Sequence, residues 1–394
     1  MANNIPALDK SHLDWPFLEH RHRKLAEEIE AWAEKNIDPS AHGSVDVDEV
    51  CRALVRQLAA AGFLQYSVAR RSLNEKLDVR SMCIIRETLA RYSGLADFAF
   101  AMQCLGSVAI SLYGTDELQQ DYLAAVSAGD KLAAFALTEP DAGSDVASLR
   151  TSAVRDGDDY VIHGEKTFIS NGGIASFYTV FARTGGPGAG GISAFILDAD
   201  TAGLEIAERI DVIAPHPLAR LKFNGCRISK DKMLGAEGQG FRVAMATLDV
   251  CRSTVGAAAL GFSRCALNEA LGRTSSRELF GAPMTAIPGV QSQLADMALN
   301  IDTSALLIYR AAWTRDCMAD RVTREAAMAK LHATDSAQLT IDAAVQLFGG
   351  MGVTCGVKVE ELYREIRALR IYEGASEVQK LIIARQTLAN AGVL

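Results

Sequence analysis

The sequence has few of the short motifs that mark familiar catalytic sites. It contains no HExxH and no GxSxG, and its seven histidines are dispersed along the chain. These absences argue against metalloproteases and against serine hydrolases of the α/β type. The eight cysteines include no CxxC pair, which argues against a zinc site or a redox dithiol and predicts free, mostly buried thiols. We therefore expect no metal site.

Excess positive charge is also lacking. The formal net charge is -8, which argues against a broad surface attraction to nucleic acid or to anionic lipid. The first residues show no basic and apolar leader, and no apolar run of membrane length is apparent. We therefore expect a cytoplasmic protein that binds neither nucleic acid nor a membrane and holds anionic ligands at a local site.

What is present is a chain of 394 residues with three successive patterns. Residues 1–130 repeat apolar positions at helical spacing, as in Leu25, Ile29 and Ala33, and Thr115 is placed to cap a later helix. Residues 131–235 contain alternating β-rich runs, and residues 236–394 return to long helical patterns that favour a bundle. The absence of βαβ alternation argues against a dinucleotide-binding Rossmann enzyme.

Turn residues divide the β region further. Asp156 and Gly157 indicate a hairpin between two strands. The glycine-rich run from 185 to 191 lies between two strand-like runs and lacks the GK[ST] of a phosphate-binding loop. It is therefore expected to be an ordinary connecting loop.

Three polar segments could bind a ligand. Residues 135–145 form a turn rich in small residues, in which Gly143 permits close backbone approach, although the turn could simply redirect the chain. Within 164–172, strand alternation would place Phe168 and Ser170 on one face. Glu373 precedes Gly374 in a break before a helix of about 377–390, expected to be capped by a serine. Taken alone, Glu373 could be an ordinary solvated loop glutamate.

Together these segments resemble, in order, the acyl-CoA dehydrogenase family, and the resemblance covers roughly residues 20–390. The matching stretches are ALTEPDAGSD (136–145), GEKTFISNG (164–172), SSRELFG (275–281), VQLFGGMG (345–352), LYRE (362–365) and IYEGASEVQ (371–379). The resemblance implies an α+β fold with a helical N-terminal domain (1–130), a β-barrel-like or β-sandwich middle domain (131–235) and a C-terminal four-helix bundle (236–394). It also implies FAD as cofactor.

The resemblance assigns roles to particular residues. Phe135, Leu137 and Thr138 would lie against the isoalloxazine, with Phe168 packed on the ring and Ser170 hydrogen-bonded near N5. Arg277 would reach the pyrophosphate of a neighbouring subunit's FAD. The full cofactor set is Phe135, Leu137, Thr138, Gly143, Ser144, Phe168, Ile169, Ser170, Arg277, Phe280, Gln346, Gly349, Gly350, Ala375 and Glu377. The substrate set is Ser144, Asp249, Arg252, Tyr372 and Gly374.

Glu373 matches the catalytic base of the family, which removes the α-proton of an acyl-CoA thioester while hydride passes from the β-carbon to flavin N5. Some relatives carry this base immediately before the arginine that matches Arg252, but here that position is Cys251, and a thiol is a poor substitute. The expected activity is thus acyl-CoA dehydrogenation. Alternatives with the same fold are an acyl-CoA oxidase and a β-eliminating, desulfinase-like enzyme; a flavin-dependent hydroxylase and a non-catalytic FAD-bound scaffold are of a different class.

Family resemblance also implies partners, namely an acyl-CoA substrate, an electron-transferring flavoprotein as electron acceptor and a homodimer or homotetramer. Three positions depart from the family pattern: Pro288 in place of a frequent Gln, Arg273 in place of a Tyr, and Ala375 in place of a Thr. From these we expect rearranged or weaker FAD contacts. The run from 353 to 358 also departs from the family's usual form, and His216 with Pro217 is unusual for the β domain, so we expect an atypical acyl group. Fastest flavin reduction by straight-chain saturated acyl-CoAs would contradict the second expectation.

Overall fold

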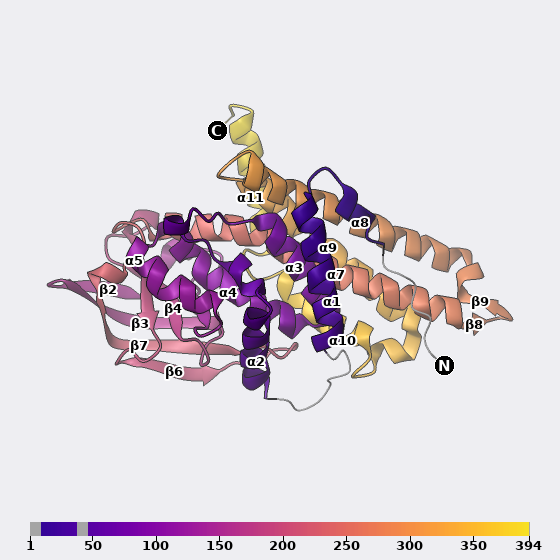
Figure 1. Cartoon of the computed structure of the whole chain (residues 1–394), viewed down its shortest axis with the longest axis horizontal. Coiled ribbons are helices and arrows are strands. Elements are labelled where there is room, and N and C mark those ends of the chain that lie inside the picture. Colours follow the sequence, from indigo (N-terminus) through magenta and orange to yellow (C-terminus); the bar gives the residue numbers. More distant parts are fainter. Residues whose placement is uncertain (1–8, 38–45, 394) are drawn as a thin grey trace. The chain divides into compact units, whose positions relative to one another are not determined.

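The computed structural model describes residues 9–37 and 46–393 (Figure 1). The chain forms two compact units. Unit 1 comprises Met1–Gly43, Val79–Asp97 and Arg252–Leu394, and unit 2 comprises Ser44–Asp78 and Phe98–Cys251. Two of the four divisions fall within helices α4 (Gly94–Tyr113) and α7 (Gly240–Ser276). Each unit is therefore assembled from segments that are far apart in the sequence.

Unit 1 is mainly helical. Helix α8 packs against α9, helix α9 packs against α10 and α11, and α3 packs against α1 and α8. Gly261 of α7 lets this helix approach α3 closely, because a Cβ there would lie 2.2 Å from the carbonyl oxygen of Glu87. Besides parts of α4 and α7, the unit contains α1 (His20–Asn36), α3 (Val79–Tyr92), α8 (Pro288–Cys317), α9 (Thr323–Phe348), α10 (Lys358–Leu369), α11 (Ser376–Asn390) and the short strands β8 (Glu278–Leu279) and β9 (Ala282–Pro283).

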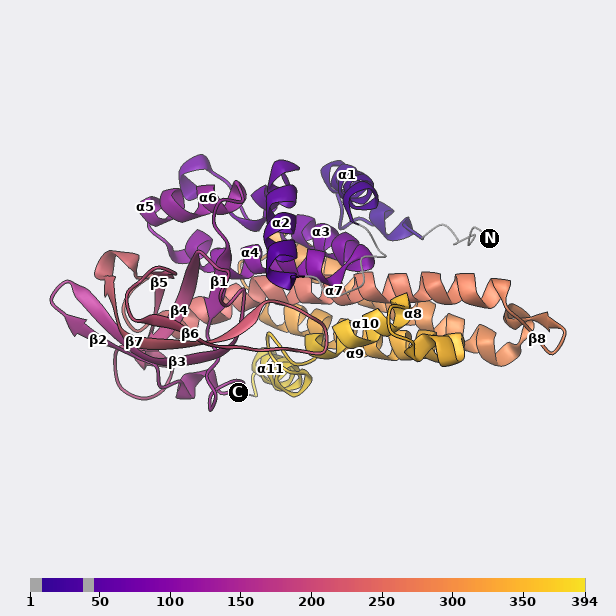
Figure 2. The ribbon, with the colours of Figure 1, turned by 90° about the horizontal axis from the view of Figure 1, so that it is seen from below.

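Unit 2 is built around a seven-stranded curled sheet (Figure 2). The strand order is β1-β4-β2-β3-β7-β6, and β5 pairs with β4; β1 and β4 are parallel, whereas the β2–β3, β3–β7, β6–β7 and β4–β5 pairs are antiparallel. The strands are β1 (Ala133–Ala136), β2 (Ser152–Asp156), β3 (Asp159–Ser170), β4 (Phe177–Arg183), β5 (Ile192–Asp198), β6 (Leu204–Arg209) and β7 (Leu218–Ser229). The helices are α2 (Val47–Ala60), α5 (Asp116–Leu118) and α6 (Ala124–Ser127), with parts of α4 and α7.

Strand β4 is buried on both faces and separates two apolar clusters. Phe177 and Phe181 join a cluster with residues of α4 and with Leu118, Leu123 and others. The alternate residues Tyr178 and Val180 join a second cluster with residues of β3, β5 and β7. Because successive side chains of a strand point to opposite faces, one continuous apolar run serves both clusters.

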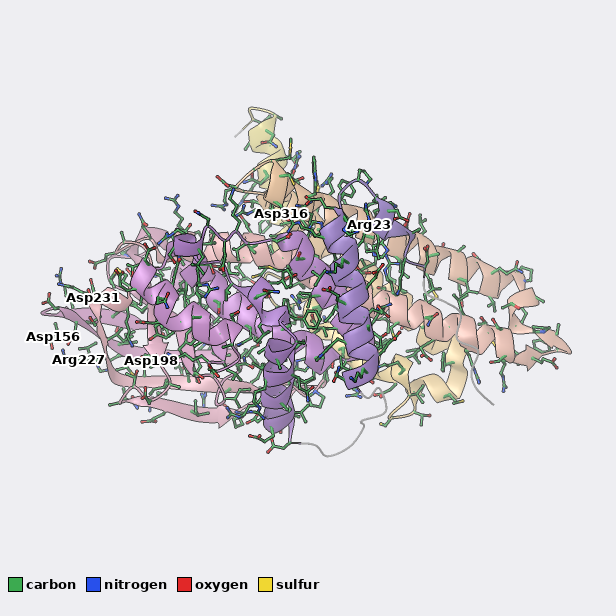
Figure 3. All side chains as sticks on the ribbon, in the orientation of Figure 1. Arg23, Asp156, Asp198, Arg227, Asp231 and Asp316 are labelled. Carbon is green, nitrogen blue, oxygen red and sulfur yellow. The ribbon has the colours of Figure 1, made fainter. Side chains whose placement is uncertain are left out.

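The helical, β and helical order expected from the sequence is confirmed, as are its local turns. The backbone N–H of Leu118 donates to Thr115 Oγ1 at 3.3 Å, as a helix cap requires. Asp156 pairs with Asp159 across the predicted hairpin, and the arginine of β7 facing this turn, Arg227, forms ion pairs with both (Figure 3). The predicted loop connects β4 to β5.

Two expectations were wrong in detail. Helix α11 begins at Ser376 and its N-cap residue is Ala375; the Ser376 hydroxyl donates to Asp335 at 2.8 Å instead of capping the helix. Helices α4 and α7 do contain stretches long and apolar enough to cross a membrane, which the sequence survey missed. These stretches are 83% and 94% buried within the protein, as in core helices. All eight cysteines are free, and five of them are buried.

Candidate functional site

The first group of candidate residues lies in unit 2, in the turn after β1. Lys166 of β3 is fully buried and donates to the carbonyl of Leu137 at 3.0 Å and to the carboxylate of Glu139 at 2.8 Å. The backbone N–H groups of Arg150 and Thr151 also donate to Glu139, so both ends of the turn are fixed. Ser144 in this turn is exposed, and a Cβ added to Gly143 would have no atom within 4 Å. The turn is therefore rigidly anchored yet open to a flat ligand.

The end of β3 continues this group. Phe168 has φ 55 and a side chain 59% exposed, in a bulge where the pairing with β7 shifts between Lys166 and Ile169. Beyond the bulge, Phe168 is exposed, Ile169 is buried and Ser170 is half-buried, which agrees with the expected alternation. Ile169 is buried in the sheet core, so a ligand would meet its main chain. The ring of Phe135 likewise packs on Phe181, with centroids 4.9 Å apart.

The second group lies in unit 1, around the loop between α10 and α11. Glu373 (φ 52) and Gly374 (φ 96) both occupy the left-handed region, which costs a non-glycine residue about 1 kcal/mol or more. Their carbonyl groups accept several hydrogen bonds. Gln379 donates to the carbonyls of Glu373 at 3.2 Å and Gly374 at 2.9 Å, and Arg252 Nε donates to that of Glu373 at 3.5 Å. The strained turn is thus held by side chains of α11 and α7.

The carboxylate of Glu373 is unlike that of a solvated loop glutamate. Its Oε2 is shielded from solvent and accepts no hydrogen bond within the described residues. Burial raises the pKa of Glu373, while the charges of Arg86, Lys330 and Arg252 act against this rise. A carboxylate that has one shielded oxygen without a hydrogen bond and a raised pKa is suited to act as a general base.

The other expected substrate residues are placed as follows. Asp249 and Arg252 are both 3% exposed and lie one turn apart on α7, although the division between the units falls between them. Cys251 is also buried, at 3%. Tyr372 is 39% exposed and immediately precedes Glu373. In unit 1, therefore, Arg252, Tyr372 and Gly374 surround the candidate base.

A third group lies elsewhere in unit 1. Arg277 immediately precedes the β8–β9 hairpin and is exposed. Phe280 lies in the turn of the hairpin and is 100% exposed, with φ 55. Arg273 lies over the ring of Phe348 at 5.7 Å, which brings the end of α7 to the end of α9, where Gln346, Gly349 and Gly350 are exposed. Figures 1 and 2 both show this hairpin at the opposite end of the helices from α11, which follows Ala375 and includes Glu377. One chain therefore does not bring this third group to Glu373.

Sequence reasoning missed three residues that contact or act on the glutamate turn: Arg86, Lys330 and Gln379. Arg86 donates to Asp97 at 2.7 and 2.8 Å and to Thr254 at 3.0 Å. Lys330 falls on the buried face of α9 with Ala326, Ala333 and Ala337. A lysine at helical spacing within an apolar stripe was the available signal, because lysine is rarely buried without a specific partner.

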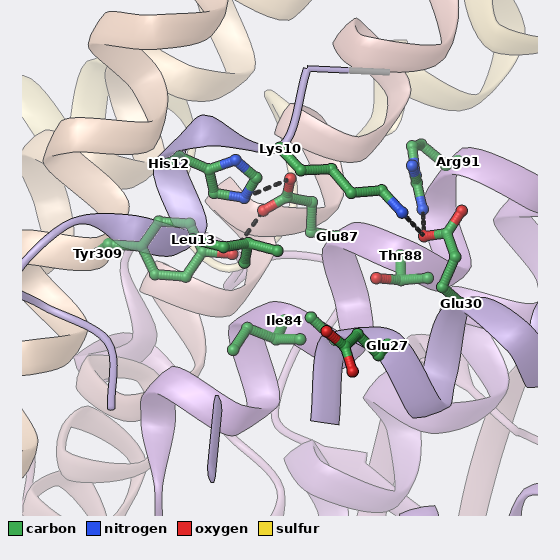
Figure 4. Close-up of a pocket in the computed structure, with 11 residues that line it drawn as sticks. Lys10, His12, Leu13, Glu27, Glu30, Ile84, Glu87, Thr88, Arg91 and Tyr309 are labelled. Carbon is green, nitrogen blue, oxygen red and sulfur yellow. Dashed lines mark hydrogen bonds and ion pairs between the residues drawn. The ribbon is translucent and has the colours of Figure 1, made fainter. Parts of the chain in front are cut away.

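A separate small cavity of about 40 Å³ lies between the segment before α1 and helices α1, α3 and α8 (Figure 4). Several of its titratable groups pair with one another: His12 with Glu87, and Lys10 and Arg91 with Glu30. The hydroxyl of Tyr309 also donates to Glu87, at 2.5 Å. The cavity is far too small for a flavin or an acyl-CoA, and it is better explained as a structural ion-pair network. Within the described residues, no group of three or more His, Cys, Asp or Glu could hold a metal ion.

Comparison with known proteins identifies the class. The family models for the acyl-CoA dehydrogenase N-terminal, middle and C-terminal domains match residues 19–130, 134–226 and 238–388. A probable acyl-CoA dehydrogenase of Mycobacterium leprae is 37% identical over 377 residues, covering 94% of this chain and 96% of the relative. These matches define an oxidoreductase. The chain belongs to the acyl-CoA dehydrogenase family.

Solved structures agree with this assignment. Butyryl-CoA dehydrogenase from Megasphaera elsdenii is 32% identical with a TM-score of 0.86, covering 94% of this chain and 99% of that chain. A glutaryl-CoA dehydrogenase from Mycobacterium smegmatis in complex with FADH2 is 26% identical with a TM-score of 0.84, covering 95% of this chain and 96% of that one. The family is FAD-dependent, in agreement with the cofactor expected from the sequence.

Proposed function

We propose that this protein catalyses the α,β-dehydrogenation of an acyl-CoA thioester, with Glu373 as the base that removes the α-proton. The observation that carries the proposal is the state of Glu373, whose Oε2 is buried and without a hydrogen-bond partner in the described structure and whose pKa burial raises. In water a carboxylate is too weak a base for a proton next to a thioester. Desolvation raises the pKa of the Glu373 carboxylate, which makes it a stronger base. Hydrogen bonds to the thioester carbonyl lower the pKa of the neighbouring C–H group, which makes it a stronger acid.

The residues of the chain divide the work. The fixed turn at Glu373 and Gly374 positions the Glu373 carboxylate. The backbone N–H of Glu373 would donate a hydrogen bond to the thioester carbonyl. In unit 2, the exposed ring of Phe168 offers an aromatic face, Ser170 offers a hydroxyl donor, and the space beside Gly143 admits a flat ring. FAD, when bound there, supplies the acceptor for the β-hydride. An electron-transferring flavoprotein is the proposed partner that reoxidises it.

Replacing Glu373 with Gln tests the proposal. The amide keeps the size of the side chain but cannot accept the proton, so the purified variant should retain its flavin and lose reduction by acyl-CoA by at least about 10³-fold. The measurement is anaerobic bleaching of the flavin absorbance after mixing with substrate. Asp342→Asn, which changes an exposed acid on α9, serves as the control and should bleach like the wild type.

Undiminished bleaching in Glu373→Gln would refute the role of the base. The same assay separates the possible outcomes of the reaction. Rapid reoxidation by oxygen would favour an oxidase, and product formation without net flavin reduction would favour a β-eliminating enzyme. Reoxidation only by an electron-transferring flavoprotein would support the dehydrogenase.

We further propose that the cofactor site is completed by a second copy of the chain. Arg277 and Phe280 are exposed at the end of unit 1 away from α11, where a second copy could use them. A guanidinium suits a diphosphate because it can donate two parallel hydrogen bonds. A homodimer or homotetramer follows from this arrangement.

A further inference from the structure

A buried lysine lies beneath the turn that carries Glu373. Lys330 of α9 is fully buried, and its Nζ donates to the carbonyl of Gly374 at 2.8 Å. The same carbonyl accepts from Gln379 at 2.9 Å. A cation and an amide from two helices therefore meet at one peptide oxygen, directly after the proposed base.

The charge of Lys330 acts on Glu373 without forming an ion pair with it. The charged neighbours that influence Glu373 come from four places: Arg86 of α3, Asp97 of α4, Arg252 of α7 and Lys330 of α9. Arg86 is already bound to Asp97 through two hydrogen bonds. None of the ion pairs in the described residues includes Lys330, whose described partner is a main-chain oxygen.

The neighbouring acid on α9 is also occupied. Asp335 accepts from Arg370 at 2.8 Å and from the hydroxyl of Ser376 at 2.8 Å, so both flanks of the turn are held by it. Tyr372, which precedes the base, carries no charge at ordinary pH, since a phenol is neutral there and desolvation of this one raises its pKa further. The positive charge of Lys330 is thus less neutralised by neighbouring acids than that of Arg86 or Arg370.

We propose that Lys330 is a positioning residue for the reaction: it fixes the Glu373–Gly374 turn through the Gly374 carbonyl and supplies a positive charge that favours the ionised form of the Glu373 carboxylate while leaving that carboxylate unpaired. The role in catalysis rests on the proposed function of Glu373. An ion pair would also favour the carboxylate but would occupy the oxygen that must accept the proton. Directing the ammonium group to a carbonyl avoids this conflict.

The pKa of Lys330 agrees with the same arrangement. Burial lowers the pKa of Lys330 to about 8, against the opposing charges of Glu373 and Asp335. The lysine therefore remains mostly charged at neutral pH. Removing its charge should raise the pKa of Glu373 further, since the charge acts to lower it. The protonated, inactive form of Glu373 would then persist to higher pH.

Two variants separate the effect of the Lys330 charge from the effect of its hydrogen bond to the Gly374 carbonyl. Lys330→Gln removes the charge but keeps a donor, and Lys330→Met removes both. In each, the acidic limb of the rate of anaerobic flavin reduction should move to higher pH by about one unit. The rate at the alkaline plateau should fall about ten-fold in Lys330→Met and much less in Lys330→Gln, because only the methionine releases the turn.

Infrared spectroscopy gives a readout that does not depend on turnover. The band of the protonated Glu373 carboxyl, assigned by its absence in Glu373→Gln, should titrate about one pH unit higher in both Lys330 variants. This shift should appear even if Glu373 is not the base, so the two proposals can fail separately. An unchanged titration midpoint and pH profile in Lys330→Gln would overturn the role of the charge.

Lys358→Met is the matched control. Lys358 is another lysine of unit 1 that donates to a main-chain carbonyl, that of Tyr92 at 3.0 Å, but it is not among the charges that act on Glu373. The Lys358→Met variant should leave the titration midpoint of Glu373 unchanged. A shift of this midpoint as large as that in the Lys330 variants would contradict the proposal. If neither Lys330 variant retains flavin, Gln379→Leu provides the test, because Gln379 donates to the same turn. A lower plateau rate with an unshifted pH profile would support the role of the fixed turn, and an unchanged rate would refute it.

Discussion

At the scale of single residues, backbone strain gathers where ligands are expected. Among the described residues, the non-glycine positions with positive φ are Asn74, Phe168, Asn171, Phe280 and Glu373. Phe168, Phe280 and Glu373 were each singled out from the sequence for a ligand or for catalysis. Such conformations persist only where surrounding contacts enforce them. At Glu373 those contacts are the hydrogen bonds to its own carbonyl and to that of Gly374.

The glycine after the base gives a direct test of this strain. In Gly374→Ala, the new Cβ would lie 2.3 Å from Gln379 Nε2, and φ 96 disfavours any side chain. The turn should shift and lose the Gln379 hydrogen bonds, lowering the rate of flavin reduction by about 10- to 100-fold while FAD stays bound. Stopped-flow absorbance measures the effect. Gly289→Ala, where a Cβ meets nothing within 4 Å, should behave like the wild type.

The position of Glu373 on a loop before a glycine could be predicted from the sequence, but its environment could not. Arg86 and Lys330 reach it from helices α3 and α9, and a local pattern says nothing about which distant helices will pack beside a loop. Their burial results from tertiary packing. The same limit applies to Ser376, whose hydroxyl prefers Asp335 of α9 to the cap position.

At the scale of elements, β3 and the turn after β1 are joined by a buried ion pair. Burial acts to raise the pKa of Glu139, but Lys166 and the hydrogen bonds from Arg150 and Thr151 outweigh it, so the pKa is lowered. The stability that this pair contributes is therefore present above the unfolded pKa and is lost as pH falls toward the folded value.

Lys166→Met should destabilise the protein by about 3–5 kcal/mol at neutral pH, because it leaves the Glu139 carboxylate buried without its cation. The difference from the wild type should narrow in acid, where Glu139 becomes protonated at little cost. Urea unfolding at neutral and acidic pH measures both effects. Lys230→Met, which breaks the exposed pair with Asp158, should change stability little. A pH-independent difference would count against the explanation.

The elements themselves were largely predictable where local chemistry decides them. Thr115, Asp156 and Gly157 act within a few residues of their own position, and the structure confirms each. The bulge at Phe168 could not be predicted, because it depends on how β3 pairs with β7. Alternation within one strand cannot reveal a register shift imposed by its neighbour.

At the scale of the whole molecule, the order of helical and β regions could be predicted from hydrophobic periodicity. Which distant residues form the candidate site could not be predicted in this way. Periodicity reports which faces are buried, and this determines the type of each element. The candidate cofactor residues fall into groups in unit 2 and at two ends of unit 1, a distribution that no periodicity encodes. Only the resemblance to a family connected them.

The proposed second copy leads to a prediction about cofactor retention. If Arg277 completes the FAD site of a neighbouring chain, Arg277→Gln should weaken FAD binding at least about ten-fold without preventing association. Wild-type FAD affinity should also fall when the oligomer is diluted to monomers. Flavin fluorescence and analytical ultracentrifugation measure the two effects. Arg242→Gln, an exposed arginine of unit 2, is the control; equally tight FAD binding by monomers would refute the shared site.

The interleaved composition of the two units has a consequence for how the protein is made. Helices α1 and α3 pack together but belong to a unit whose remaining segment starts only at Arg252. On the ribosome, these early helices must wait, without their final apolar partners, until most of the polypeptide has been synthesised. Release of a nascent fragment ending near residue 130 would therefore present chaperones and proteases with exposed core surface rather than with a finished domain.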